Sequence, residues 1–224
     1  MAMKAIHTFV CAAGLAGLAL LSSSSSVQGG EEPPPPGALH GKFITETRVK
    51  TRGATSDKDL VLYLTPKEDV EVDASKAKIE VVQEKLQFAP HVVACQVGST
   101  LVFQNKDSVT HNVFADDDCC GADIDMEAGQ ETELQLDKAG DVAIICRLHP
   151  GMELYIKVLP YPWFTQTTIE KIKDGDKKTY EASFRIDDVP PGDYVLRFWN
   201  KSLELREFDV TIESGKELEF DIVD

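Results

Sequence analysis

The sequence predicts an all-β protein built from β-sandwiches. Short apolar runs recur along the chain, Gly, Pro, Asp and Asn separate them, and no long amphipathic helix is visible downstream of the N-terminal segment. Many short strands with turn signals between them are typical of sandwiches. The predicted strands cover residues 41–45, 59–65, 78–83, 91–97, 99–105, 111–115, 131–137, 141–147, 152–158, 181–187, 194–200, 206–212 and 218–224.

Several of these runs alternate between apolar and polar residues, which indicates one buried and one solvated face. Leu134 and Leu136 share one face of their run, and Phe208, Val210 and Ile212 share one face of another. The run 142–146 is apolar at every position. We therefore expect it to be a central strand covered on both sides.

The N-terminal segment, residues 1–29, has the pattern of a secretory signal peptide. Lys4 provides the positive end, an apolar core runs from Ile6 to Leu21, and small residues precede a cleavage site near Gly29. A membrane anchor is the alternative, but the apolar run is short for a span. The signal predicts a periplasmic or secreted protein with no membrane span in its mature form. Residues 30–38, with four consecutive prolines, read as a stiff linker.

The chain has 38 acidic residues and 23 basic ones. The 224 residues carry a formal net charge of −15, and removal of residues 1–29 would take away Lys4 and no acid. This balance argues against nucleic acid and anionic membranes as partners. It fits a solvated acidic surface, and it would also suit docking onto a basic partner protein.

Four cysteines lie outside the predicted signal peptide: Cys95, Cys119, Cys120 and Cys146. An exported protein can keep disulfides, and an even number of cysteines allows two bridges. Adjacent Cys119 and Cys120 are poor partners for each other, whereas either could pair with Cys95. A bridge at Cys146 would compete with a role for that thiolate as a metal ligand.

Residues 146–152 place three soft ligands at regular intervals. Cys146 ends a predicted strand, His149 lies on a turn with Pro150 and Gly151, and Met152 begins the next strand. By alternation, Cys146 and Met152 point inward with their strands' apolar residues. His111 begins another predicted strand and can supply a second imidazole. A thiolate, two imidazoles and a weak axial thioether form the ligand set of electron-transfer copper sites.

The runs "FAPHVVACQVGSTLVFQNKDSVTHNVF" and "CRLHPGM" resemble those of cupredoxins, the blue-copper family of plastocyanin and amicyanin. The resemblance implies a Greek-key sandwich over residues 70–159 with one type 1 copper site. It carries over His111, Cys146, His149 and Met152 as the copper ligands. Asn112 matches the family's hydrogen-bonding residue beside the first histidine. His91 is a weaker candidate and is better explained as the start of a strand.

The segment 116–125 is rich in aspartate and contains Cys119 and Cys120. Its carboxylates could hold Ca²⁺, but their spacing does not match an EF-hand. The two cysteines could bind a second soft metal. We favour a solvated acidic loop with one disulfide.

Residues 160–224 resemble the second half of a carboxypeptidase regulatory-like, or transthyretin-like, β-sandwich. The resemblance lies in a Thr-rich turn, "FRI", and the turn "VPPGDY". Residues 39–66 are similar to the first half of such a module. We therefore hypothesise that the copper domain is inserted into this smaller sandwich. The alternative is that residues 39–66 belong to the copper domain. The combination resembles exported bacterial proteins labelled methylamine-utilisation or plastocyanin-like.

These features favour a single-electron carrier that exchanges electrons with a redox partner, basic in character and cytochrome-like. The alternatives are a copper-binding or copper-delivery protein and a cell-surface recognition module without a redox role. We expect no enzymatic activity, because a multicopper oxidase needs further His-rich clusters and no hydrolase motif is present.

Overall fold

The computed structural model describes residues 32–49, 57–115, 120–201 and 203–223. All of its strands lie in one compact unit, Pro34–Asp224. Strands and turns account for the regular structure of these described residues, in agreement with the predicted all-β class. No helix capable of crossing a membrane occurs among them. The predicted signal peptide, 1–29, and Cys119 lie outside the described residues.

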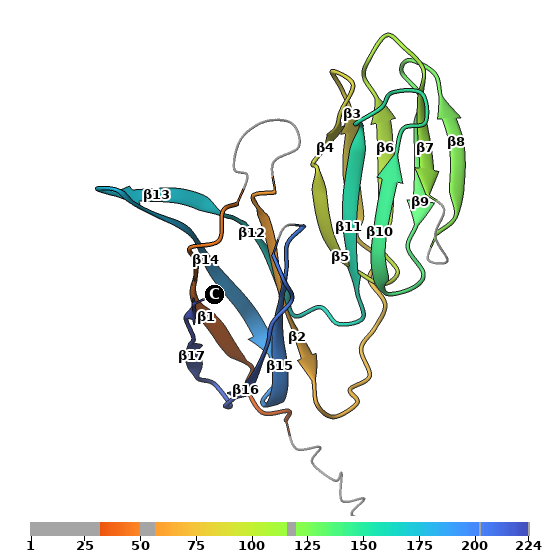
Figure 1. Ribbon diagram of the computed structural model, residues 1–224. Helices are drawn as coiled ribbons and strands as arrows, with labels where there is room; N and C mark the ends of the chain where they lie inside the picture. Colours follow the sequence, from red (N-terminus) through yellow and green to blue (C-terminus); the bar gives the residue numbers. More distant parts are fainter. Residues whose placement is uncertain (1–31, 50–56, 116–119, 202, 224) are drawn as a thin grey trace, which may run out of the picture. The chain divides into compact units, whose positions relative to one another are not determined.

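The central part of the chain forms a two-sheet sandwich, the central sandwich (Figure 1). One sheet has the order β5-β11-β10-β7-β8, and the other has the order β4-β3-β6-β9. Two parallel pairs, β3 with β6 and β5 with β11, accompany the antiparallel ones. The strands are β3 (Lys78–Gln83), β4 (Phe88–Ala89), β5 (Val92–Gln96), β6 (Thr100–Asn105), β7 (His111–Ala115), β8 (Ala122–Met126), β9 (Glu131–Gln135), β10 (Gly140–Ile145) and β11 (Glu153–Leu159).

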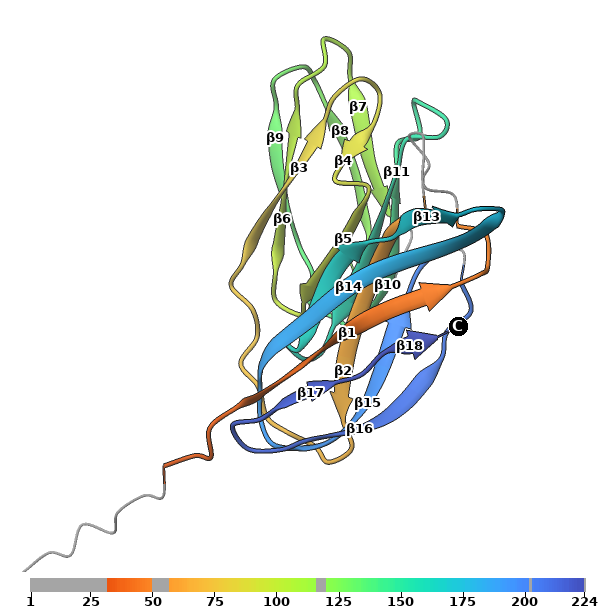
Figure 2. The same cartoon turned by 90° about the vertical axis from the view of Figure 1, so that its left-hand side faces the viewer.

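The segments before and after it form a second pair of sheets, the flanking sandwich. Figure 2 shows β14, β1, β17 and β18 side by side in one sheet, and the other sheet has the order β12-β2-β15-β16. In β1, Gly41 pairs with Phe184, and in β2, Leu62 pairs with Phe198. The strands are β1 (Gly37–Thr45), β2 (Asp59–Pro66), β12 (Phe164–Thr168), β13 (Glu170–Asp174), β14 (Lys177–Val189), β15 (Gly192–Trp199), β16 (Glu207–Ile212), β17 (Glu217–Glu219) and β18 (Ile222–Val223).

Each sandwich has its own buried core. In the flanking sandwich, Phe43 and Phe198 pack edge to face with ring centroids 4.9 Å apart. In the central sandwich, Leu101, Phe103 and Ile144 are fully buried. Full burial of one such side chain contributes about 1.5–3 kcal/mol to folding. Burial of apolar side chains in these two cores therefore supplies the main driving force for folding of both sandwiches.

The side-chain amide of Gln166, on β12, completes the outer edge of β5. It accepts a hydrogen bond from the Ala94 N–H at 3.0 Å and donates one to the Val92 carbonyl at 3.2 Å. An edge strand would otherwise leave these backbone groups without strand partners. Val61, Tyr63, Val92 and Leu159 form a small buried cluster in the same region.

Two expectations about the strands were wrong. Residues 142–146 are not covered on both sides: Val142 and Ile144 are buried, whereas Ala143 and Ile145 of β10 are exposed. The reason is that a two-sheet sandwich buries only the inner face of each sheet. The segment 116–125 is not wholly a loop, because Ala122–Met126 forms β8 and pairs with β7. The strands β12 and β13 and the two-residue β4 were also missed.

Candidate metal centre

A tight loop, residues 146–152, joins β10 to β11 and carries three of the predicted ligands. The Cys146 N–H donates to the Met152 carbonyl at 3.0 Å, and the Met152 N–H donates to the His149 carbonyl at 3.2 Å. Gly151 has φ +85°, in a region that glycine adopts without steric cost. The loop therefore folds back on itself and brings Cys146, His149 and Met152 to one end of the central sandwich.

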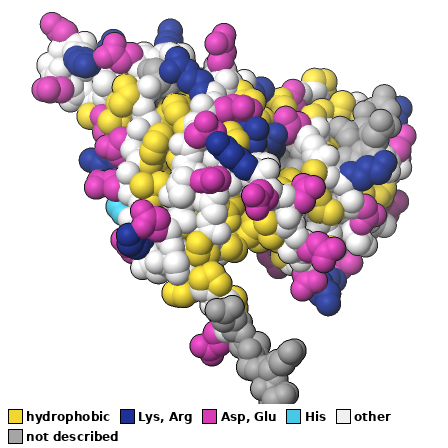
Figure 3. All heavy atoms as spheres, turned by 90° about the horizontal axis from the view of Figure 1, so that it is seen from below, with side chains coloured by type: hydrophobic (Ala, Val, Ile, Leu, Met, Phe, Trp, Pro, Cys, Tyr) yellow, Lys and Arg dark blue, Asp and Glu magenta, His cyan; other side chains and the backbone are white. Residues whose placement is uncertain are grey.

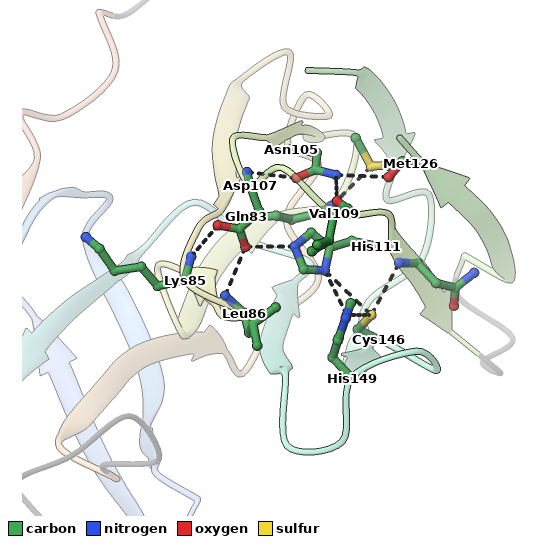
Figure 4. Close-up of polar contacts among 11 residues, drawn as sticks. Gln83, Lys85, Leu86, Asn105, Asp107, Val109, His111, Met126, Cys146 and His149 are labelled. Atoms are coloured by element: carbon green, nitrogen blue, oxygen red, sulfur yellow. Dashed lines mark hydrogen bonds and ion pairs between the residues drawn. The ribbon is translucent and has the colours of Figure 1, made fainter. Parts of the chain in front are cut away.

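His111 reaches the same place from β7, the strand beside β10. Its ring is fully buried, and its Nδ1 lies 3.1 Å from Nδ1 of His149 and 3.9 Å from Sγ of Cys146 (Figure 4). The Cys146 Sγ lies 3.5 Å from the His149 Nδ1. Cys146 is a free thiol, buried like His111, while His149 is half-buried. The three donor atoms thus face one another at a point just below the surface.

This arrangement fits one shared metal ion. Protein metal–nitrogen and metal–sulfur bonds are about 2.0–2.3 Å long, so two ligands of one ion lie about 3–4 Å apart. The three observed separations fall in that range. A thiolate with two imidazoles is a donor set suited to copper in both of its oxidation states.

Met152 lies at the end of the same loop, with 1% of its surface exposed. It packs in the buried core that contains Cys146 and Leu154. The alternation of the two strands predicts this inward position for both sulfur-bearing residues. The structure thus places all four predicted ligands on two neighbouring segments, and the part that each plays toward a metal remains a prediction.

Asp107 is a member of the site that the sequence reasoning missed. Its carboxylate accepts a hydrogen bond from Nε2 of His111 at 2.8 Å and from the N–H groups of Lys85 and Leu86 at 2.7 and 2.9 Å. Burial raises the pKa of Asp107, but these hydrogen bonds outweigh it and hold the pKa below its ordinary value. The spacing of four residues from His111 was a usable signal, because a short loop can return a carboxylate to the histidine.

Asn105 shapes the loop that carries Asp107. Its side-chain nitrogen donates to the carbonyls of Val109 and Met126 at 2.8 and 2.9 Å, and its oxygen accepts from the Asp107 N–H at 3.0 Å. Asn105 is itself buried. These bonds fix the path of residues 105–109 into β7 and hence the position of His111 (Figure 4).

Asn112 links the two ligand segments. Its backbone N–H donates to Sγ of Cys146 at 3.3 Å, and its side-chain nitrogen donates to Asp123 at 3.0 Å and Asp125 at 2.8 Å. The sequence indicated a hydrogen-bonding role for Asn112 but not these partners. Both carboxylates belong to β8, the strand missed in the acidic segment.

The other candidate residues, His91, Cys95 and Cys120, are not members of this donor group formed by the described residues. The Nδ1 of His91 is 2.9 Å from the Glu153 carbonyl, and its ring packs edge to face against Tyr155. Cys95 is buried in β5, and Cys120 packs against the same core. The predicted disulfide, which would join Cys119 or Cys120 to Cys95, stays a prediction, since Cys119 lies outside the described residues.

The sandwich and its donor group define the central part of the chain as a cupredoxin-like domain. Residues 75–159 match the family of copper binding proteins described as plastocyanin/azurin. This match, together with the donor chemistry, supports copper as the cofactor of the domain. No curated protein matches the chain significantly.

Several solved structures resemble part of the chain. A Cu(I) form of an amicyanin variant is 21% identical, with 43% of this chain and 99% of that chain covered and a TM-score of 0.34. A reduced tryptophan-to-tyrosine variant of amicyanin is 24% identical with the same coverage and TM-score. A purple cupredoxin from Nitrosopumilus maritimus is 21% identical, with 36% and 99% covered and a TM-score of 0.31.

Proposed function

We propose that the protein is an exported single-electron carrier with one type 1 copper site, held by His111, Cys146, His149 and Met152. The observation that carries this proposal is the convergence of two imidazole nitrogens and one free thiol within 3.1–3.9 Å of one another. Copper bound there would supply the Cu(I)/Cu(II) couple. The residues contribute a rigid cage, because His111, Cys146 and Met152 are buried and their loops are closed by backbone hydrogen bonds.

A preformed cage favours electron transfer over other uses of a metal. Asp107 accepts a hydrogen bond from Nε2 of His111, the ring nitrogen that faces away from the donor group, and the Asn112 N–H donates to the sulfur of Cys146. Groups that are fixed in this way move little when the charge of a bound ion changes. A site built for release would be expected to leave more of its ligands unrestrained.

The half-buried His149 gives the site an edge toward solvent, and exposed apolar side chains lie on the loops around it. Leu86, Val109 and Leu148 are 49%, 43% and 51% exposed, on the β3–β4 turn, the loop before His111 and the ligand loop. Apolar side chains of this kind suit the buried core of a docking interface, from which water is excluded. We infer that electrons pass at this edge to a redox protein.

The partner we propose is basic and cytochrome-like, because the chain carries a net charge of −15. On the face seen in Figure 3, Asp and Glu are interspersed with Lys and Arg. Steering by the net charge of the protein should weaken as salt is added. A docking rate that did not change with ionic strength would count against a basic partner.

The test of the copper site is spectroscopic. The purified protein supplied with Cu(II) should show an intense blue thiolate-to-copper band and a narrow copper hyperfine splitting in EPR. Cys146→Ser should abolish both, whereas Cys95→Ser, which removes a buried thiol outside the donor group, should preserve them. A colourless protein, or a blue band retained in Cys146→Ser, would overturn the proposal.

Copper delivery is the alternative function, and one further measurement separates it from electron transfer. An electron carrier should be reduced and reoxidised repeatedly with its copper retained. A delivery protein should instead pass Cu(I) to an acceptor thiol peptide within the time of the assay.

A further inference from the structure

Arg147, the residue after Cys146, contacts side chains of β7, the strand that carries His111, and of the neighbouring strand β8. Its guanidinium lies over the ring of Phe114 at 4.7 Å and donates to Oδ2 of Asp123 at 2.6 Å. The other oxygen of Asp123 accepts from the Asn112 side chain. The backbone N–H of Asn112 in turn donates to Sγ of Cys146.

These contacts form a closed circuit. It runs from the Cys146 sulfur to Asn112, through Asp123 to Arg147, and along the backbone to Cys146 again. The pairing of β7 with β8 explains it, because Phe114 lies opposite Asp123 and Asn112 lies opposite Asp125. Directly opposed residues of an antiparallel pair project from the same face, so the two carboxylates, the amide and the ring are neighbours.

The circuit depends on the carboxylates of β8. Asn112 is 3% exposed, and its side-chain oxygen is buried with no hydrogen-bond partner among the described residues. Its amide orientation therefore rests on the two bonds that its nitrogen donates to Asp123 and Asp125. Of these two carboxylates, Asp123 is the one that also holds Arg147.

We propose that Asp123 is a positioning residue for the Cys146 ligand. It connects the strand that carries His111 to the loop that carries Cys146, and so keeps the Asn112 N–H on the sulfur. Hydrogen bonds to a coordinating sulfur tune the electronic character of a metal site. The inference rests on the proposed copper function and extends it to a residue outside the ligand set.

The effect should be local, not a general loss of stability. The side chains of Arg147 and Asp123 are 52% and 56% exposed, and ion pairs this exposed contribute little to global stability. Asp125 provides a matched control, because it bonds the same nitrogen of Asn112 and carries the same charge. The difference between the two aspartates therefore isolates the link to Arg147.

The experiment compares Asp123→Asn with Asp125→Asn in the full chain. Asn112 and Arg147 donate to different oxygens of Asp123, and an asparagine at 123 replaces one of these oxygens with a donor NH₂ group, so the two bonds cannot both persist in the observed geometry. In the metal-free protein, hydrogen exchange at the backbone N–H of Asn112 should become about tenfold faster in Asp123→Asn and change less than about twofold in Asp125→Asn. In the copper-loaded protein, release of Cu(I) to a chelator should quicken by about tenfold in Asp123→Asn alone.

Arg147→Gln tests the same link from the other side. It should reproduce the effect of Asp123→Asn, and the double variant should be no worse than either single one, because both remove one interaction. Equal effects in the two aspartate variants, or additive effects of the changes at 123 and 147, would overturn the proposal. The exchange measurement needs no metal, so it judges the circuit even if the wild-type protein binds no copper and the proposed function fails.

Discussion

The carboxylate of Asp107 accepts a hydrogen bond from Nε2 of His111 at 2.8 Å, on the side of the ring opposite the other donors. The same carboxylate accepts from the backbone of Lys85 and Leu86. One side chain therefore ties the β3–β4 turn to a predicted metal ligand. It also determines which nitrogen of His111 stays available to the site.

Asp107→Ala should destabilise the metal-free protein. It leaves the Nε2 of the fully buried His111 without an acceptor, and an unsatisfied buried polar group costs about 1–3 kcal/mol. Denaturant unfolding measures the loss. Asp107→Asn retains an oxygen acceptor and should lose less, and the exposed Asp176→Ala should be neutral. Equal stability of Asp107→Ala and wild type would show that the hydrogen bond is unimportant for folding.

Lys85→Gly should stabilise the protein. Lys85 and Leu86 form a two-residue turn with φ of 57° and 58°, a conformation in which hairpins usually place Asn and Gly. For a residue with a side chain, such a φ costs about 1–2 kcal/mol, whereas the extra chain entropy that glycine loses on folding costs about 0.5–1 kcal/mol. We therefore expect the free energy of unfolding to increase by up to about 1 kcal/mol. Thermal unfolding should show it. Lys106→Gly, in the adjacent loop without a positive φ, should instead lose stability.

Gly41→Ala should strongly destabilise the sheet that contains β1. A Cβ at position 41 would lie 2.0 Å from the backbone oxygen of Phe220, so either the main chain must shift or the parallel pairing with β18 must loosen. Overpacking of this kind costs about 1–3 kcal/mol or more. At Gly140 a Cβ would meet nothing within 4 Å, so Gly140→Ala should be near neutral. Similar denaturant midpoints for the two variants would contradict this reading.

Asp59→Asn should raise stability at neutral pH. Burial raises the pKa of Asp59 above its ordinary value of 3.8, against the lowering effects of Lys58 and His91. The folded protein therefore binds the proton more tightly than the unfolded chain does. The contribution of Asp59 to wild-type stability should rise as pH falls from neutral through the raised pKa toward 3.8, because protonation removes the cost of the buried charge.

The advantage of Asp59→Asn, below about 1 kcal/mol for a partly buried carboxylate, should thus shrink on acidification. Unfolding free energies of the two proteins measured between neutral pH and about pH 4 test the sign. The exposed Asp174→Asn controls for the loss of one negative charge. An advantage that grew as the pH fell would reverse the assignment.

The alternation of apolar residues was sufficient to predict most strands, because many of them bury one face. It placed Cys146 with Val142 and Ile144, and Met152 with Leu154, and all five side chains are buried. The same rule failed for Ala143 and Ile145. Their composition matches that of a doubly covered strand, and a sequence does not reveal that only one face has a neighbouring sheet.

Contacts between distant segments were harder to predict. The bond from Asp107 to the β3–β4 turn and that from Asp123 to Arg147 join residues that no periodic pattern relates. The strand β8 was missed because its aspartates suggested a solvated loop, although Ala122, Ile124 and Met126 alternate with them. Those aspartates lie on the outer face of β8, where they accept hydrogen bonds from the side chain of Asn112.

The pairing of β1 with β14 and of β2 with β15 has a consequence for biosynthesis. A ribosome makes these two N-terminal strands before the central sandwich and their partners after it. Every strand of the central sandwich pairs with another strand of that sandwich, so the central sandwich can fold before the partners of β1 and β2 have been made. Pairing of β1 with β14 and of β2 with β15 closes a long loop, which is slow. Until then, the apolar residues of β1 and β2 remain exposed. The central sandwich, with the metal cage that it contains, could therefore form before the flanking sandwich does.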